Sequence, residues 1–343
     1  MPIPQIEIVP VGNGKELHRF VTLPWKVYRG DANWVPPLIG DMKSMLRPEK
    51  HPFYRHGEVA LFMALRRGEP VGRIAAIINH RHNEFQEEKT GFFGFFETVN
   101  DPYVSGALLE RAADWARERG MDRLRGPASF STNEECAMLI SGFDSPPCVM
   151  MPYNPPYYPT LMEGAGFTKA KDLVAYNLTR EEASEDRLRR LAEVIAQREQ
   201  VSIRPIDRKR FGEEVANFSV VYNQAWEKNW GFVPMTDEEI EHMAKSLKSV
   251  IEPDLVLFMQ KNGSTIGFAM ALPDLNRALK HANGRLFPFG LVKILWYARR
   301  IHKVRVLVLG LLKEYRGRGL DILLYLHLYR NGLRKGYTEG EFS

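Results

Sequence analysis

One turn of the sequence is rich in glycine and arginine: Leu311-Leu312-Lys313-Glu314-Tyr315-Arg316-Gly317-Arg318-Gly319-Leu320-Asp321. It follows an apolar run over 304–312 that predicts a strand, and it precedes a helical pattern over 319–335. Glycines let the backbone approach a ligand closely, and the free N–H groups at the start of a helix bind anionic oxygens. The pattern therefore predicts a phosphate-binding loop. A plain strand–turn–helix connection with solvated arginines is the alternative.

The order of strands and helices around this turn occurs twice along the 343 residues. Each half contains a strand-like hairpin with glycine in its turn, at 58–78 and at 255–272. The economical interpretation is two copies of one α/β plan with mixed sheets. We expect a first domain over 1–180, a charged linker helix over 181–200 and a second domain over 201–343.

The composition is that of a globular protein, with 44% hydrophobic and 26% charged residues, which allows one large core or two. No apolar run is long enough to span a bilayer, and the N-terminus has no secretory pattern. Two cysteines build neither a disulfide framework nor a four-ligand zinc site. We therefore expect a cytoplasmic protein without a metal, and membrane association stays open. The last 63 residues hold 12 Lys and Arg against 4 Asp and Glu, which favours an anionic ligand or surface there.

The run from Arg316 to Asp321, between strand and helix, resembles the signature of the GNAT acyltransferase superfamily, Arg/Gln-x-x-Gly-x-Gly/Ala. Asp321 departs from it, because the signature has Gly or Ala there. A carboxylate at a helix start suits the helix dipole but repels a diphosphate. The resemblance implies that backbone amides grip the pyrophosphate of an acyl-coenzyme A (acyl-CoA), and it implies these binding residues: Leu311, Leu312, Lys313, Arg316, Gly317, Arg318, Gly319 and Leu320.

The resemblance covers nearly the whole chain and implies a tandem GNAT-like acyl-CoA N-acyltransferase fold. Only the second copy keeps the signature, so the first is a degenerate, structural copy. Its tail resembles the closing helix, turn and strand of a GNAT fold, the strand at 172–178; the second copy, which stops at Ser343, is expected to lack them. The runs over 133–136, 142–144, 222–234 and 273–276 resemble a bacterial family of this length. Some of its members are associated with attaching fatty acyl chains to long-chain bases.

Acyl transfer to an amine needs a base for the ammonium proton and donors for the carbonyl oxyanion. Many GNAT enzymes carry a Glu on the strand before the loop, but 304–312 has no acidic residue. Our candidates for catalytic residues therefore lie elsewhere: Asp274, Asn276, Tyr222, Glu227 and Asn229. An Asx-type turn is the alternative for Asp274 and Asn276, and aromatic capping of a core is the alternative for the cluster around Asn229.

The stretch 286–303 is apolar and aromatic and carries four cations, Lys293, Arg299, Arg300 and Lys303. A helix that contacts a membrane surface or an acyl chain has this composition, and so does a buried packing helix. Both interpretations stay open, and the basic flank favours lipid contact.

These features together predict direct acyl transfer from acyl-CoA, or from an acyl carrier protein, to an amine. The apolar stretch favours a lipid-like acceptor or a long acyl donor over a small polar amine. A non-catalytic acyl-CoA-binding or regulatory protein is the alternative, favoured by Asp321 and by the missing strand carboxylate. We expect no nucleic-acid partner, because the sequence shows no recognition helix, zinc motif or aromatic platform.

Overall fold

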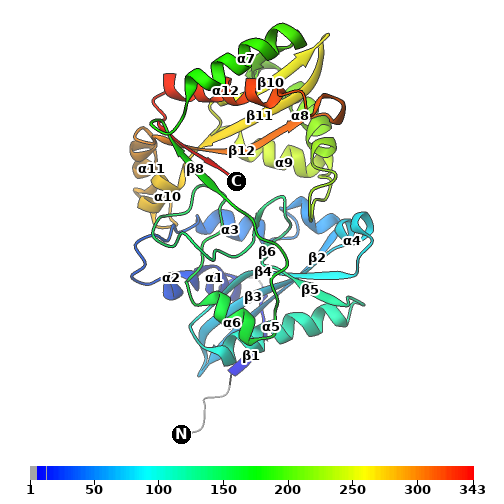
Figure 1. Cartoon of the computed structure of the whole chain (residues 1–343). Helices are drawn as coiled ribbons and strands as arrows, with labels where there is room; N and C mark the ends of the chain where they lie inside the picture. Colours follow the sequence, from blue (N-terminus) through cyan, green and yellow to red (C-terminus); the bar gives the residue numbers. More distant parts are fainter. Residues whose placement is uncertain (1–5, 13) are drawn as a thin grey trace. The chain divides into compact units, whose positions relative to one another are not determined.

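The structure is a computed structural model that describes residues 6–12 and 14–343, and the chain divides into two units (Figure 1). The first unit extends to Asp172 and also includes Leu279–Leu295. The second consists of Leu173–Ala278 and Trp296–Ser343. The division thus lies at Leu173 instead of near residues 180–200, and a segment expected in the second domain belongs to the first unit.

The first unit is built on a five-stranded sheet with its strands in chain order. Every neighbouring pair is antiparallel except the last, which is parallel. The strands are β1 (Ile6–Pro10), β2 (Gly57–Arg66), β3 (Glu69–Asn79), β4 (Thr90–Thr98) and β5 (Arg123–Arg125). The smaller elements of this unit are η1 (Pro52–Arg55), α4 (His80–Gln86), β6 (Ala128–Ser129), β7 (Glu135–Cys136) and α6 (Tyr158–Gly164).

Helices cover both faces of this sheet, which explains why β3 is almost continuously apolar. Ile74 and Ile78 lie in one core with residues of α5 (Pro102–Arg117). Ile77 lies in a second core with residues of α1 (Lys15–Thr22), and residues of α3 (Ile39–Met45) pack against that core. A separate short helix, α2 (Pro24–Val27), follows α1 and begins at a proline.

The second unit repeats the same plan. Five of its strands have the order and directions of the first sheet, again with a parallel last pair. These strands are β9 (Ser202–Pro205), β10 (Val256–Lys261), β11 (Ser264–Pro273), β12 (Lys303–Leu311) and β13 (Glu339–Phe342). The prediction of a repeated mixed α/β fold is confirmed.

A sixth strand, β8 (Tyr176–Thr179), pairs antiparallel with β13 in this second sheet. The sequence predicted a strand here as the closing strand of the first copy. Its pairing differs because β13 would otherwise leave a row of backbone N–H and C=O groups unpaired at its outer edge. The second sheet is therefore extended by a strand that precedes it in the chain.

The helix expected as a linker, α7 (Glu185–Glu199), is part of the second core. Its Ala192 and Ile195 are buried together with residues of α12 (Leu320–Arg334), and the two helices lie side by side in Figure 1. On the opposite face, Phe218 of α8 (Phe211–Ala225) packs on Phe268 of β11. The remaining helices are α9 (Asp237–Leu247), α10 (Asn276–Leu279), α11 (Gly290–Ala298), η2 (Arg208–Arg210), η3 (Pro253–Leu255), η4 (Lys280–Ala282) and η5 (Lys313–Tyr315).

Candidate functional site

The glycine-rich turn joins β12 to α12 in the second unit. Gly317 and Gly319 have φ angles of 72° and 79°, in the left-handed region that favours glycine. Gly319 is the N-cap of α12, a helix of 15 residues, and no side chain caps its first turn. The first N–H groups of an α-helix have no partner four residues earlier; in α12 the N–H of Ile322 donates to the carbonyl oxygen of Gly319 (3.0 Å), so those of Leu320 and Asp321 are the ones available to an anionic ligand.

Two arginines hold this loop in place. Arg316 donates hydrogen bonds from its guanidinium to the carbonyl oxygen of Leu311 (3.1 Å) and to that of Ala225 at the end of α8 (2.7 Å). Arg318 pairs with Glu199 at the end of α7 (3.4 Å), and its carbonyl oxygen accepts a hydrogen bond from Arg198 (2.6 Å). Both arginines are exposed, but they connect the loop to α7 and α8 and so fix its position.

Glu199 pairs through its carboxylate with the cations around this loop. It is a buried residue that also pairs with Lys261 of β10 (3.4 Å). Burial disfavours its charged form, but hydrogen bonds from Arg198, Lys261 and Arg318 outweigh burial and lower the pKa of Glu199. The carboxylate is therefore ionised at neutral pH, and it balances the positive charge of Arg318.

The end of α8 lies against the end of β12. A Cβ atom on Gly310 would collide with the indole ring of Trp226, so glycine is required for this contact. Tyr222 stacks between Trp226 and Phe218, at centroid distances of 5.1 Å and 5.3 Å. Gly310 was not among the site residues predicted from the sequence, although a glycine inside an apolar strand signals close approach of another group.

The carboxyl half of β12 has a different environment from its amino half. The β11–β12 register shifts where Met270 pairs with Val308 and Ala271 with Val306, so Leu307 is an extra residue, a bulge. β13 pairs only with Lys303–Val306. Within the described sheet, residues 307–311 are thus paired with β11 alone. The other edge is open between the bulge and the loop, where an extended ligand can add as a strand does.

Three of the predicted catalytic residues lie near this loop. Tyr222 belongs to the aromatic stack beside Gly310. Glu227 and Asn229 are exposed in the turn that follows α8, where the backbone N–H of Asn229 donates to the carbonyl oxygen of Trp226 (2.8 Å). The structure therefore brings Tyr222, Glu227 and Asn229 to the end of α8 that Arg316 binds.

The other two, Asp274 and Asn276, lie at the opposite end of β12. The backbone N–H of Asp274 donates to the carbonyl oxygen of Lys303, the first residue of that strand (3.0 Å). The loop follows Leu311, and eight residues at about 3.3 Å each separate the two ends by about 26 Å. Asp274 is buried and pairs with Arg277 (3.4 Å), and Asn276 begins the short helix α10. The structure does not bring this pair to the loop.

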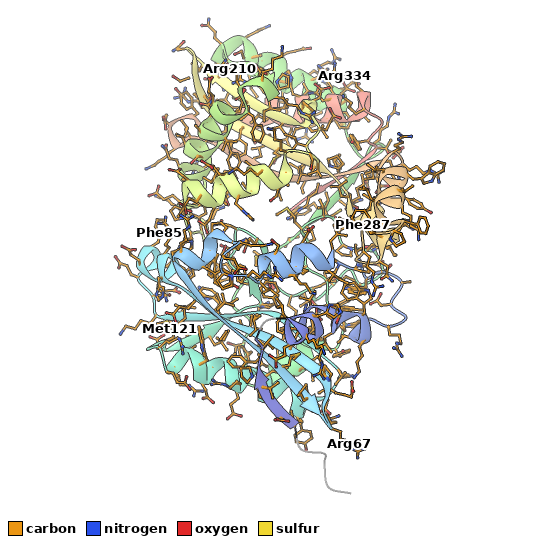
Figure 2. All side chains as sticks on the ribbon, turned by 180° about the vertical axis from the view of Figure 1, so that it is seen from behind. Arg67, Phe85, Met121, Arg210, Phe287 and Arg334 are labelled. Carbon is orange, nitrogen blue, oxygen red and sulfur yellow. The ribbon has the colours of Figure 1, made fainter. Side chains whose placement is uncertain are left out.

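The stretch 286–303 is exposed over its apolar part. Just before it, Asn283 accepts a hydrogen bond from the indole nitrogen of Trp25 (2.8 Å), which anchors the preceding turn to the first unit. Figure 2 shows Phe287 on this segment. The exposed fractions run from 44% to 79% for Phe287, Phe289, Leu291, Val292, Leu295 and Trp296. The interpretation as a buried packing helix is therefore wrong, because α11 buries only Gly290.

Neither a membrane-spanning helix nor a metal-binding cluster occurs among the residues that the structure describes. In 6–12 and 14–343, no helix is long and apolar enough to cross a membrane. The same residues contain no group of three or more His, Cys, Asp or Glu side chains that could hold a metal ion.

Comparison with known proteins places the chain in a family. No family model matches it. It is 35% identical over 351 residues to the bacterial ceramide synthase of Caulobacter vibrioides, covering 98% of this chain and 90% of that protein. It is also 35% identical over 307 residues to protein YghO of Escherichia coli, covering 89% of this chain and 78% of that protein.

Among solved structures, a tandem GNAT protein from the clavulanic acid biosynthesis pathway matches with a TM-score of 0.53 and 14% identity, covering 98% of this chain and 89% of that one. The chain therefore belongs to the family of the Caulobacter ceramide synthase and YghO, and it is an acyltransferase with the tandem GNAT fold.

Proposed function

We propose that this protein transfers a long acyl group from coenzyme A directly to the primary amine of a lipid-like acceptor. The amine nitrogen attacks the thioester carbonyl carbon, the C–N bond forms, and the C–S bond breaks to release the thiol of coenzyme A. A ceramide is the amide of a fatty acid with a long-chain amino alcohol, so the name of the Caulobacter relative fits this reaction class. The observation that carries the proposal is the loop Arg316–Leu320 at the start of α12.

The chemistry of acyl-CoA suits the residues around that loop. Its pyrophosphate is an anion, and the free N–H groups after Gly319 favour an anion. Its pantetheine arm is an extended chain with amide groups, which can pair with the open edge of β12 over residues 307–311. The thioester then lies near the bulge at Leu307, on the strand that α8 covers with Tyr222 and Trp226.

Within this proposal, Tyr222 is our preferred donor of the proton that the leaving thiolate takes up. It is held by stacking on Phe218 and Trp226, and Trp226 contacts Gly310 of the strand that leads to the loop. Asn229, in the next turn, is a candidate donor for the carbonyl oxyanion. Asp274 lies beside Lys303, four residues before the bulge at Leu307 and so about 13 Å along the strand from it, which argues against direct contact with a thioester there.

The exposed apolar stretch supports a lipid-like substrate. Phe287 and Phe289 are 79% and 70% exposed, close to the cations Lys293, Arg299 and Arg300. An apolar surface with a basic border is the pattern of segments that lie at the interface of an anionic bilayer. We infer that this segment reaches the membrane in which a lipid amine resides.

Exchange of Gly317 for glutamate should abolish the stabilisation of the fold by acyl-CoA. A Cβ atom at Gly317 meets nothing within 4 Å, although the positive φ strains any side chain there, and the new carboxylate repels the pyrophosphate. For the unmodified protein, acyl-CoA at 100 times its Kd should stabilise the fold by about 2.7 kcal/mol. Thermal unfolding with and without palmitoyl-CoA measures the difference.

Gly336→Glu is the matched control for this experiment. Gly336 also has a positive φ, 88°, and open space around its Cβ position, but it lies at the other end of α12. The control should keep the full stabilisation by palmitoyl-CoA. Equal stabilisation of both variants would exclude the loop from the binding site.

Asp321→Asn should raise the affinity for acyl-CoA and lower the free energy of unfolding. Asp321 lies in the first turn of α12, where a negative charge stabilises the helix by about 0.3–1 kcal/mol. The same charge repels the diphosphate, so its removal should raise the affinity for palmitoyl-CoA about two- to fivefold. Calorimetric titration measures the affinity, and urea unfolding measures the stability. An unchanged affinity would place the pyrophosphate away from this turn.

A non-catalytic acyl-CoA-binding protein is the second candidate function. It is favoured by Asp321 and by the lack of an acidic residue in β12. Release of coenzyme A thiol in the presence of a long-chain amine separates the two, since a binding protein releases none.

A further inference from the structure

Three cations surround one carboxylate beside the glycine loop, and the proposed function assigns them no ligand. Nε of Arg198 lies 3.0 Å from Oε1 of Glu199. Nζ of Lys261 and Nη1 of Arg318 each lie 3.4 Å from Oε2 of the same residue. Among the residues that the structure describes, Glu199 is the only carboxylate that forms an ion pair with any of the three. One carboxylate balances one positive charge, so two positive charges of this cluster have no counter-charge within it.

Contacts within the second unit hold this cluster against the loop. A Cβ atom on Gly319 would lie 2.8 Å from Cδ1 of Ile195, so the carboxyl end of α7 packs directly on the start of α12. Arg198, in the last turn of α7, donates to the carbonyl oxygen of Arg318 (2.6 Å). The guanidinium of Arg318 in turn lies over the ring of Tyr315, 5.5 Å from its centroid. The cations are therefore fixed relative to the free N–H groups of the helix start.

The cations of the cluster are accessible and have N–H donors to spare. The side chains of Arg198, Arg318 and Lys261 are 58%, 44% and 23% exposed. Arg318 uses only Nη1 and Lys261 makes one hydrogen bond, both to Glu199, within the described part of the chain. Arg316 differs from them, because carbonyl oxygens of the loop and of α8 occupy its guanidinium. Spare donors on a guanidinium or an ammonium group favour a phosphate ligand.

The chemistry of coenzyme A supplies such a phosphate. Its pyrophosphate is the anion proposed for the N–H groups of Leu320 and Asp321. The ribose that carries the pyrophosphate also carries a phosphate monoester at its 3′ oxygen, with a charge of about −1.5 to −2 at neutral pH. That charge matches the two positive charges left over in the cluster. An acyl carrier protein has no such group, because its phosphopantetheine is joined directly to a serine.

We propose that Arg198, Lys261 and Arg318 bind the 3′-phosphate of coenzyme A. The acyl donor is then a free coenzyme A thioester and not an acyl carrier protein. This inference rests on the proposed function for the place of the pyrophosphate, and it deepens that function by naming the class of donor. The helix that the sequence predicted as a linker thus takes part in donor recognition.

The experiment is a calorimetric titration of the full chain with octanoyl-CoA and with octanoyl-3′-dephospho-CoA. The unmodified chain should bind octanoyl-CoA at least about tenfold more tightly, since only this thioester makes the charged hydrogen bonds to the cluster. In Arg198→Gln the ratio of the two affinities should fall to about threefold or less, with little change for the dephospho thioester. Octanoyl-4′-phosphopantetheine, which represents the carrier-protein donor, should bind no better than the dephospho thioester.

Matched variants make the ratio specific to this cluster. Arg187→Gln removes an exposed cation from the same helix, 11 residues earlier and so about 16 Å away, and should leave the ratio unchanged. Arg198→Lys keeps the charge and should restore most of the ratio. Lys261→Gln is the second test, because Lys261 lies on β10 and should lower the ratio even if Arg198→Gln displaces the loop.

Two results would overturn the proposal. One is equal affinity of the unmodified chain for octanoyl-CoA and its dephospho form. The other is an equal loss of affinity for both thioesters in Arg198→Gln and in Lys261→Gln, which would mean that these cations only hold the loop. Failure of the proposed function differs from both, since no thioester would then bind and Gly317→Glu would change nothing.

Discussion

Replacement of Tyr222 by phenylalanine is expected to lower kcat by about 10²–10⁴ with little change in the affinity for acyl-CoA. The substitution removes only the hydroxyl, so the stacking on Phe218 and Trp226 is retained. Without the hydroxyl, the leaving thiolate has no positioned proton donor. Single-turnover kinetics with palmitoyl-CoA and a long-chain amine measure the loss, and thermal unfolding checks the fold.

Two further variants make this result specific. Tyr337→Phe, a partly buried tyrosine packed against the core on the α12 face, should leave kcat unchanged. Asp274→Asn should change kcat by only a few-fold, but it should cost about 1–3 kcal/mol of stability because Asp274 is buried beside Arg277. A large loss of turnover in Asp274→Asn together with normal turnover in Tyr222→Phe would move the chemistry to the opposite end of β12.

Replacement of both Phe287 and Phe289 by serine is expected to reduce vesicle binding by about 10²–10⁴, since transfer of each phenyl group into the interface contributes about 1.5–3 kcal/mol. The two rings are 79% and 70% exposed, so the free energy of unfolding should hardly change. Sedimentation with phosphatidylglycerol vesicles measures the binding, and the fluorescence of Trp296, 56% exposed, reports the contact.

Charge and surface controls belong to the same experiment. Arg299→Glu with Arg300→Glu should weaken binding to anionic vesicles by about 1 kcal/mol per basic residue removed, an effect that salt screens. Val194→Ser, an exposed apolar position on α7, should have no effect. If the unmodified chain does not bind anionic vesicles, the inference that this segment contacts a lipid surface fails.

Local patterns in the sequence predicted most of the elements. The hairpins, the strand 304–312 and the helix after Gly319 appear in the structure within a few residues of the predicted bounds. Helix α9 begins with a capping box at Thr236. These features follow from side-chain periodicity, glycine conformation and backbone capping, which act over a few neighbouring residues.

Strand partners and unit membership were not predictable in the same way. β8 pairs with β13 across more than 150 residues of sequence, and residues 279–295 belong to the first unit. An open sheet edge accepts any strand of suitable length, so the partner is chosen by the packing of the whole chain. The same holds for α7: its buried apolar residues Ala192 and Ile195 are those of any amphipathic helix, and the sequence does not show which core they join.

For the candidate site, the sequence by itself determined the glycine loop, because the left-handed φ angles and the free helix start are local properties of Gly317 and Gly319. Only the tertiary structure separated Asp274 from that loop and placed Tyr222 beside it. Only the tertiary structure, likewise, brought Arg73 of β3 to Glu97 of β4, with Nη2 and Oε1 3.6 Å apart. Charges inside apolar strands are visible in a sequence, but the partner that balances each charge depends on which strands the fold makes neighbours.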